Sequence, residues 1–279
     1  MISVSVILSL ALAPFVLGQS NNSELGIEAI EAHFTNAGIV PSLLASFDPS
    51  AVLTLSYNGV GNISPGQALT NTQVAPIPDL LVTPANSTVQ LTGNYTVVMA
   101  DAGPVGTDES QGQTRHWLVN SVPLTGDSSG FNVSTSTGLA ITDYAGPAPA
   151  PGSGAHRYVI LLYSQPSNFT APDGLNTPGV AVSTFSLSDY VKNSNLGPIV
   201  AGMYITVEAG TASFTPSSTA AVVTSTLPAA QSTGSTSGTS SGSSDAASPT
   251  GNTSSNGAGN VFASLSKTVA AAIFGLILL

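Results

Sequence analysis

Two of the three histidines in this chain begin apolar segments, and they are the residues best suited to proton transfer or anion binding. His116 stands in RHWLV and His156 in HRYVILLY, each with an arginine beside it. Asp101 closes a third apolar segment, YTVVMAD. Such segments are predicted strands, and strand ends that open onto loops are common positions for functional side chains. Either these three side chains converge on one pocket, or each is a satisfied structural group. His33, in a predicted helix, is interpreted as a surface or capping residue.

Three kinds of chemistry fit a cluster of two imidazoles and a carboxylate. These groups are metal ligands, although no HxH or HxxxH spacing supports a metal site. In a hydrolase, one histidine would act as general base while Asp101 orients it. In an anion site, imidazole and loop N–H groups would receive a phosphate or carboxylate oxygen, with Trp117 and Tyr158 as walls.

An activated nucleophile is not evident in the sequence. GxSxG sequences occur at 126–130 and 238–242. The first lacks the flanking strand and helix of a nucleophile elbow, so it is interpreted as a surface turn. The second lies in a Ser/Thr-rich segment. Cysteine is absent from the chain, which excludes thiol nucleophiles, disulfides and thiolate metal sites. We therefore expect neither catalysis nor a cofactor.

The segment before His156 must position that histidine. Residues 146–154 read GPAPAPGSG and carry no charge. Proline fixes φ and removes a backbone donor, so this segment can be neither helix nor central strand. It is predicted to be a stiff loop that delivers His156 and Arg157 to the start of a strand.

The remaining pattern predicts a mostly β domain, largely antiparallel, with a few helices. Predicted helices cover 24–37, with Ser23 as N-cap, and 186–193, and a short helical turn covers 41–47. The predicted strands, separated by Gly, Pro and Asn, are residues 52–57, 87–91, 95–100, 116–119, 158–163 and 202–208.

The charge balance and the two ends indicate where the protein acts. Lys and Arg total 4 against 14 Asp and Glu, which excludes a nucleic-acid partner. Residues 1–18 read as a signal peptide, 19–214 as the folded domain, 215–256 as a disordered Ser/Thr-rich stalk and 257–279 as a GPI-attachment propeptide, with Asn256 as the ω residue. The expected location is extracellular, on the outer face of the plasma membrane or in the cell wall. Candidate N-glycosylation sites are Asn21, Asn62, Asn86, Asn94, Asn132, Asn168 and Asn252.

The same residues resemble those of the phosphatidylethanolamine-binding protein family. The match is carried by PGQALT at 65–70, YTVVMAD, RHWLVN, DYAGPAPAPGSGAHRYVILLY and LGPIVAG at 196–202. The resemblance implies a large antiparallel sheet packed on a smaller one, with a few peripheral helices. It also implies a small anion pocket lined by Asp101, His116, Ala148, Pro149, His156 and Tyr158.

The resemblance also ranks the functions. It favours a surface protein, similar to secreted fungal members, that binds small anions or phospholipid headgroups. The alternatives are a protease inhibitor, as in the carboxypeptidase Y inhibitor branch, and a structural wall glycoprotein with a degenerate pocket. Two departures alter the pocket wall: the acidic loop at 101–104 is shorter than in the family, and Ala148 replaces the family's glycine.

Overall fold

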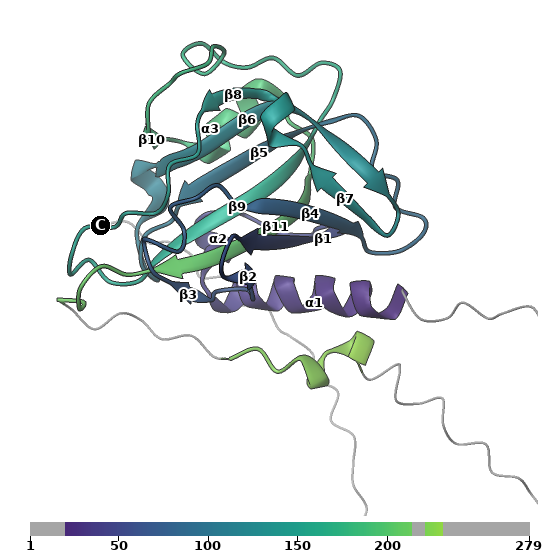
Figure 1. Cartoon of the computed structure of the whole chain (residues 1–279), viewed down its shortest axis with the longest axis horizontal. Coiled ribbons are helices and arrows are strands. Elements are labelled where there is room, and N and C mark those ends of the chain that lie inside the picture. Colours follow the sequence, from purple (N-terminus) through teal and green to yellow (C-terminus); the bar gives the residue numbers. More distant parts are fainter. Residues whose placement is uncertain (1–19, 214–220, 231–279) are drawn as a thin grey trace, which may run out of the picture. The chain divides into compact units, whose positions relative to one another are not determined.

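The computed structural model describes residues 20–213 and 221–230 (Figure 1). The predicted signal peptide, the predicted anchor signal and most of the predicted stalk, including Asn252 and Asn256, lie outside these residues. Within them, no helix combines the length and the apolar character needed to cross a bilayer.

The described residues form strands and a few short helices. The helices are α1 (Ser20–Asn36), α2 (Ile39–Ser42) and α3 (Leu187–Ser194), with 3₁₀ turns η1 (Glu109–Gln111), η2 (Thr135–Thr137) and η3 (Thr224–Thr226). The strands are β1 (Ala51–Tyr57), β2 (Gly61–Asn62), β3 (Ala68–Leu69), β4 (Asp79–Pro84), β5 (Asn94–Asp101), β6 (Gln113–Asp127), β7 (Gly130–Val133), β8 (Leu139–Thr142), β9 (His156–Gln165), β10 (Ser183–Phe185) and β11 (Ile199–Val207).

One long strand, β6, joins two sheets. Its first part pairs with β5, β8 and β10 in the larger sheet, and its last part pairs with β7 in the smaller one. The strand order is β2-β1-β4-β7-β6-β5-β9-β11-β3, and every pairing is antiparallel except β11 with β3. The β5–β6 ladder shifts register near Ser121, whose φ of 56° bends the strand. This arrangement confirms the predicted mostly β fold.

The core lies between the two sheets and between the sheet and α1. Strands β5, β9 and β11 are buried along nearly their whole length, which explains why their sequences are continuous apolar runs rather than alternating ones. Phe34 of α1 stacks on Phe47 with ring centroids 3.9 Å apart. Both rings lie against Gly202 of β11, which has no side chain to obstruct them. In Figure 1, α1 runs beneath β1 and β11.

The predicted strand at 87–91 is wrong, because a side chain there closes a turn. Asn86 Oδ1 accepts a hydrogen bond from the Thr88 backbone N–H at 3.0 Å, and the Asn86 carbonyl accepts one from Val89 N–H at 3.2 Å. This Asx turn overrides the β propensity of Thr and Val. The strand in this region is β4, which ends just before the turn.

Helix positions differ in part from those predicted. Ser23 lies inside α1 rather than at its N-cap, because the helix begins at Ser20. The helical turn predicted at 41–47 occurs earlier, directly after Gly38, which adopts the left-handed conformation with φ 63°. Helix α3 is confirmed, and its N-cap Ser186 accepts a hydrogen bond from Asp189 N–H at 3.2 Å.

Candidate functional site

Three neighbouring strands bring the predicted site residues to one end of the larger sheet. Asp101 is the last residue of β5 and His156 the first of β9. Asp101 lies directly opposite Tyr158 in the β5–β9 ladder. Side chains alternate along a strand, so His156 and Tyr158, two residues apart, share a face with Asp101. His116 comes from β6, on the other side of β5.

His156 and Asp101 form a close pair. The ring Nδ1 lies 3.0 Å from Oδ1 and 2.9 Å from Oδ2, and the two side chains are 18% and 12% exposed. A carboxylate only accepts hydrogen bonds, so Nδ1 carries the proton. Asp101 Oδ1 also accepts from Gly103 N–H at 2.8 Å. The carboxylate thereby fixes both the ring orientation and the start of the following loop.

Tyr158 stands between the two histidines. Its ring centroid is 5.1 Å from that of His116, edge to face, and 6.3 Å from that of His156, nearly parallel. The hydroxyl is buried without a hydrogen-bond partner in the described structure, although the Asp101 carboxylate and the Ala148 backbone lie beside it. Burial, and then the charge of Asp101, raise the pKa of Tyr158. The group therefore remains a neutral O–H donor.

His116 is oriented by the loop that follows β8. Its Nδ1 lies 3.0 Å from the Ala145 carbonyl, and the Ala145 N–H donates to the His116 carbonyl at 2.9 Å. A carbonyl only accepts, so Nδ1 carries the proton and Nε2 of the neutral ring is an acceptor. His116 becomes a donor at Nε2 only when it takes up a second proton.

The loop at 146–154 is irregular and held at both ends. A Cβ at Gly146 would lie 2.7 Å from the Val74 carbonyl oxygen, so the backbone approach there requires glycine. Pro149 is buried and Ala148 is exposed. Gly152 donates its N–H to the Ala209 carbonyl at 2.8 Å. The loop and the residue before it thus contact His116 through Ala145 and His156 through Ser153, and the exposed Ala148 has its backbone beside Tyr158.

The two arginines beside the histidines point away from this site. Arg157 is 1% exposed and donates to the carbonyls of Ala37 and residues 102–104. Its guanidinium is also 3.6 Å from the carboxylate of Glu109. Burial lowers the pKa of Arg157. Arg115 is equally buried and donates to groups around β8 and β10. Both cations support loops and leave the site without an arginine.

One polar residue at the site was missed in the sequence. Ser153 Oγ lies 2.8 Å from His156 Nε2, on the side of the ring opposite Asp101. The available signal was a hydroxyl three residues before the histidine, between Gly152 and Gly154, which allow a tight turn.

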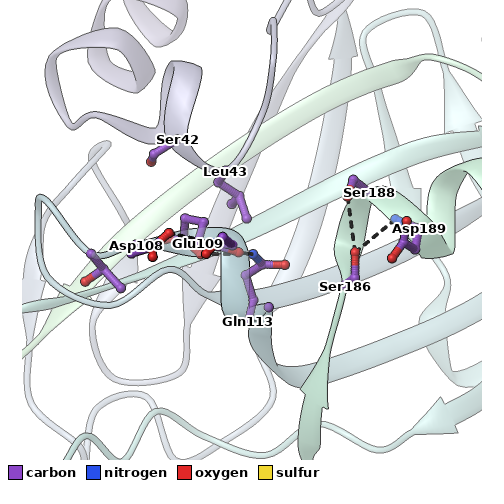
Figure 2. A pocket seen from close by; sticks show the side chains of 11 residues that line it. Ser42, Leu43, Asp108, Glu109, Gln113, Ser186, Ser188 and Asp189 are labelled. Atoms are coloured by element: carbon purple, nitrogen blue, oxygen red, sulfur yellow. Dashed lines mark hydrogen bonds between the residues drawn. The ribbon is translucent and has the colours of Figure 1, made fainter. Parts of the chain in front are cut away.

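Two cavities of the described structure lie near this region, and one of them touches the site. A cavity of about 410 Å³ is lined by residues 104–107, Gly152, Ser153, His156 and Ser213. A larger one, of about 600 Å³, is lined by polar and acidic side chains that include Asp108, Glu109 and Asp189 (Figure 2). It contains none of the predicted site residues. Among the described residues, no three His, Asp or Glu side chains are placed to hold a metal ion.

The two-sheet fold and the polar cluster at its strand ends are those of a binding protein. Comparison with known proteins identifies the family. The family model for phosphatidylethanolamine-binding protein matches residues 45–205, and the chain belongs to this family. It is 30% identical to a 26 kDa secreted antigen of Toxocara canis over 174 residues, which are 61% of this chain and 61% of the antigen. It is 29% identical to CEN-like protein 1 of Nicotiana tabacum over 63% of this chain and 91% of that protein.

A solved structure is also similar. The carboxypeptidase Y inhibitor, in complex with its cognate proteinase, superposes with a TM-score of 0.53 and 25% identity, over 68% of this chain and 97% of the inhibitor. This likeness supports the two-sheet fold.

Proposed function

We propose that this protein binds a small anion, such as the phosphoryl headgroup of a phospholipid, between His116, His156 and Tyr158. The observation that supports this most strongly is the Tyr158 hydroxyl, which is buried beside the Asp101 carboxylate and the Ala148 backbone without a well-formed hydrogen bond in the described structure. A buried polar group left unpaired costs about 1–3 kcal/mol, so such groups are retained where a ligand can pair with them. Ala148 and Pro149 complete the proposed wall.

The charges around the proposed pocket determine how it would hold an anion. Arg115 and Arg157 point elsewhere, so binding depends on neutral donors and on the histidines. The Asp101 carboxylate is paired with His156, which limits its repulsion of a ligand. His116 can donate from Nε2 only as the imidazolium, and anion binding is therefore coupled to proton uptake.

Calorimetric titration with O-phosphorylethanolamine and with inorganic phosphate tests this proposal. We expect saturable binding at one site, weakened about tenfold by Tyr158→Phe and unchanged by His33→Gln in α1. An absence of saturable binding to the wild-type protein would overturn the proposal and leave the wall-glycoprotein interpretation.

Protease inhibition is the second candidate, and the similarity to the carboxypeptidase Y inhibitor favours it. Carboxypeptidase turnover with and without the added protein decides this point. Slower turnover that depends on protein concentration would support inhibition, and undiminished turnover at a large molar excess would remove it.

The location we propose is the cell surface, through the signal peptide and GPI signal read at the two ends. The side chains of Asn62, Asn94, Asn132 and Asn168 are exposed, which is what glycosylation requires. A phosphatidylinositol-specific phospholipase should release the protein from cells. Retention, when a control GPI-anchored protein is released, would contradict the anchor.

A further inference from the structure

The contact between Ser153 and His156 extends the site beyond anion binding. Ser153 Oγ is 2.8 Å from His156 Nε2, and His156 Nδ1 is 2.9 Å from Asp101 Oδ2. A hydroxyl, an imidazole and a carboxylate in this order form the hydrogen-bonded chain that activates serine nucleophiles, and such chains are recognised by geometry rather than by sequence position. We propose that Ser153 is an activated nucleophile that accepts the acyl group of small uncharged esters. This reaction uses His156, which also lines the anion site proposed above, but it does not require an anion to be bound.

The backbone holds Ser153 in place. Its N–H donates to the Ala150 carbonyl at 3.1 Å, which closes a turn. The Gly152 carbonyl accepts from the backbone N–H and the hydroxyl of Ser213, both at 2.9 Å. Gly152 and Gly154 have φ of 80° and 89°, a conformation that a side chain would strain. The hydroxyl is therefore positioned toward the ring before any substrate arrives.

The protonation state of His156 decides whether Ser153 can react. Asp101 holds the proton on Nδ1, so Nε2 of the neutral ring can accept the Ser153 hydroxyl proton. Ser153 Oγ also lies 2.6 Å from the Ala150 carbonyl oxygen. When the ring gains a second proton, Nε2–H donates to Oγ and the hydroxyl turns to Ala150. Reactivity therefore requires the neutral ring and should increase as pH rises.

The groups around His156 agree with this role. Asp101 of β5 and Tyr158 of β9 face the ring, and His116 of β6 lies beyond Tyr158. Glu109 and Arg157 pair with each other, and both also interact electrostatically with the Asp101 carboxylate. Among the described residues, Asp101 is the charged group in hydrogen-bonding contact with the ring, so its carboxylate stabilises an imidazolium formed during the reaction.

A substrate has room beside the hydroxyl. The cavity of about 410 Å³ is bounded by residues 104–107 on one side and by Gly152, Ser153 and His156 on the other. Apart from His156, its lining contains no ionisable side chain. An uncharged acyl group therefore fits this cavity better than a charged one.

The proposed step conserves atoms and charge. Ser153 Oγ forms a bond to the ester carbonyl carbon as its proton passes to His156 Nε2. The tetrahedral intermediate collapses, the bond to the alkoxy oxygen breaks, and the departing alcohol takes the proton from Nε2. Water then attacks the acyl-serine, gives its proton to Nε2 and releases a carboxylic acid, and that proton returns to Ser153.

Acetylation by p-nitrophenyl acetate tests the proposal, read by p-nitrophenol release and by peptide mass mapping. We expect one acetyl group on Ser153, formed at least tenfold more slowly in His156→Gln and absent from Ser153→Ala. Acetylation should also accelerate as pH rises, because only the neutral ring accepts the hydroxyl proton. Ser129→Ala is the matched control, because Ser129 Oγ contacts the Asp127 carboxylate at 2.6 Å but no imidazole. It should react like the wild-type protein.

Two results would overturn the assignment: acetyl groups only on other residues, or equal rates in wild-type and Ser153→Ala proteins. Melting temperatures establish whether the variants fold. If Ser153→Ala does not fold, Ser153→Thr is the substitute variant, because it keeps a hydroxyl at this position. The two proposals have separate readouts: an acetyl group on Ser153 reports the nucleophile, and saturable sulfate binding to the wild-type protein reports the anion site, so either can fail while the other stands.

Discussion

Tyr158 lies directly opposite Asp101 in the β5–β9 ladder, and its hydroxyl is buried beside that carboxylate without a well-formed hydrogen bond. Replacing it by phenylalanine removes an unpaired buried oxygen and leaves the packing of the ring unchanged. We therefore expect Tyr158→Phe to be as stable as the wild-type protein or up to about 1 kcal/mol more stable, although it binds anions more weakly. Chemical denaturation measures the first effect. A loss of more than about 1 kcal/mol would show that the hydroxyl has a partner within the protein.

Sulfate affinity should rise as pH falls. The sulfate charge is constant across the neutral pH range, whereas His116 donates from Nε2 only as the imidazolium. Calorimetry in buffers of different ionisation enthalpy should show proton uptake on binding. His116→Gln should bind weakly throughout this range and lose the pH dependence. Equal affinity across this range in the wild-type protein would contradict a donor role for His116.

Arg157 supports the loop that follows Asp101, so its removal should affect stability before function. Arg157→Met removes the ion-pair partner of Glu109 and the guanidinium donor of the Ala37 and Ala102 carbonyls in a buried position, and we expect a loss of about 3 kcal/mol. Lys192→Met, at an exposed position of α3, should change stability by less than about 0.5 kcal/mol. Similar urea midpoints for the two variants would refute this account of the loop.

Gly202 should be intolerant of any side chain. A Cβ there would lie 2.9 Å from Phe47, 3.0 Å from Leu161 and 3.1 Å from Phe34. Overpacking of this kind typically costs about 1–3 kcal/mol. Phe47→Leu makes space, so it should destabilise the Gly202→Ala protein less than it destabilises the wild-type protein. Additive losses would show that α1 does not pack on β11 at this point.

Buried tyrosines should limit stability at high pH. Burial raises the pKa of Tyr57 and Tyr190 from 10.0 to about 12 each, so the folded state holds more protons than the unfolded state between these values. The contribution of these tyrosines to the free energy of unfolding is therefore fully present below about pH 10. It falls as pH rises toward 12, by up to roughly 3 kcal/mol for each group. Tyrosinate absorbance and tryptophan fluorescence should change together. Tyrosine ionisation without loss of Trp117 fluorescence would contradict this prediction.

Much of the larger sheet could be predicted from sequence, because β5, β6, β9 and β11 contain continuous apolar runs, and such runs predict buried strands. The placement of Asp101 and His156 at strand ends followed from those runs. Alternation along β9 also implies that Arg157 faces away from His156. The carbonyl groups that Arg157 contacts lie in the loop after β5 and at the end of α1. These segments are distant in sequence, so no local pattern predicts the contacts.

Other features depend on local geometry that propensity does not capture. The side chain of Asn86 closes a turn and displaces the predicted strand, and α1 begins before the residue expected to cap it. The proximity of Ser153 to His156 arises from one turn between two glycines. The conformation of that turn determines whether the Ser153 hydroxyl lies beside the imidazole or points to solvent.

The central claim, that His116 and His156 line one anion site, is tested most directly by imidazole ¹⁵N NMR during a sulfate titration. The chain has only 3 histidines, and His33 in α1 is an internal control. We expect the His116 and His156 signals to shift together along one saturation curve while the His33 signals stay in place. Shifts of all three histidines in proportion to sulfate, or of none, would contradict it.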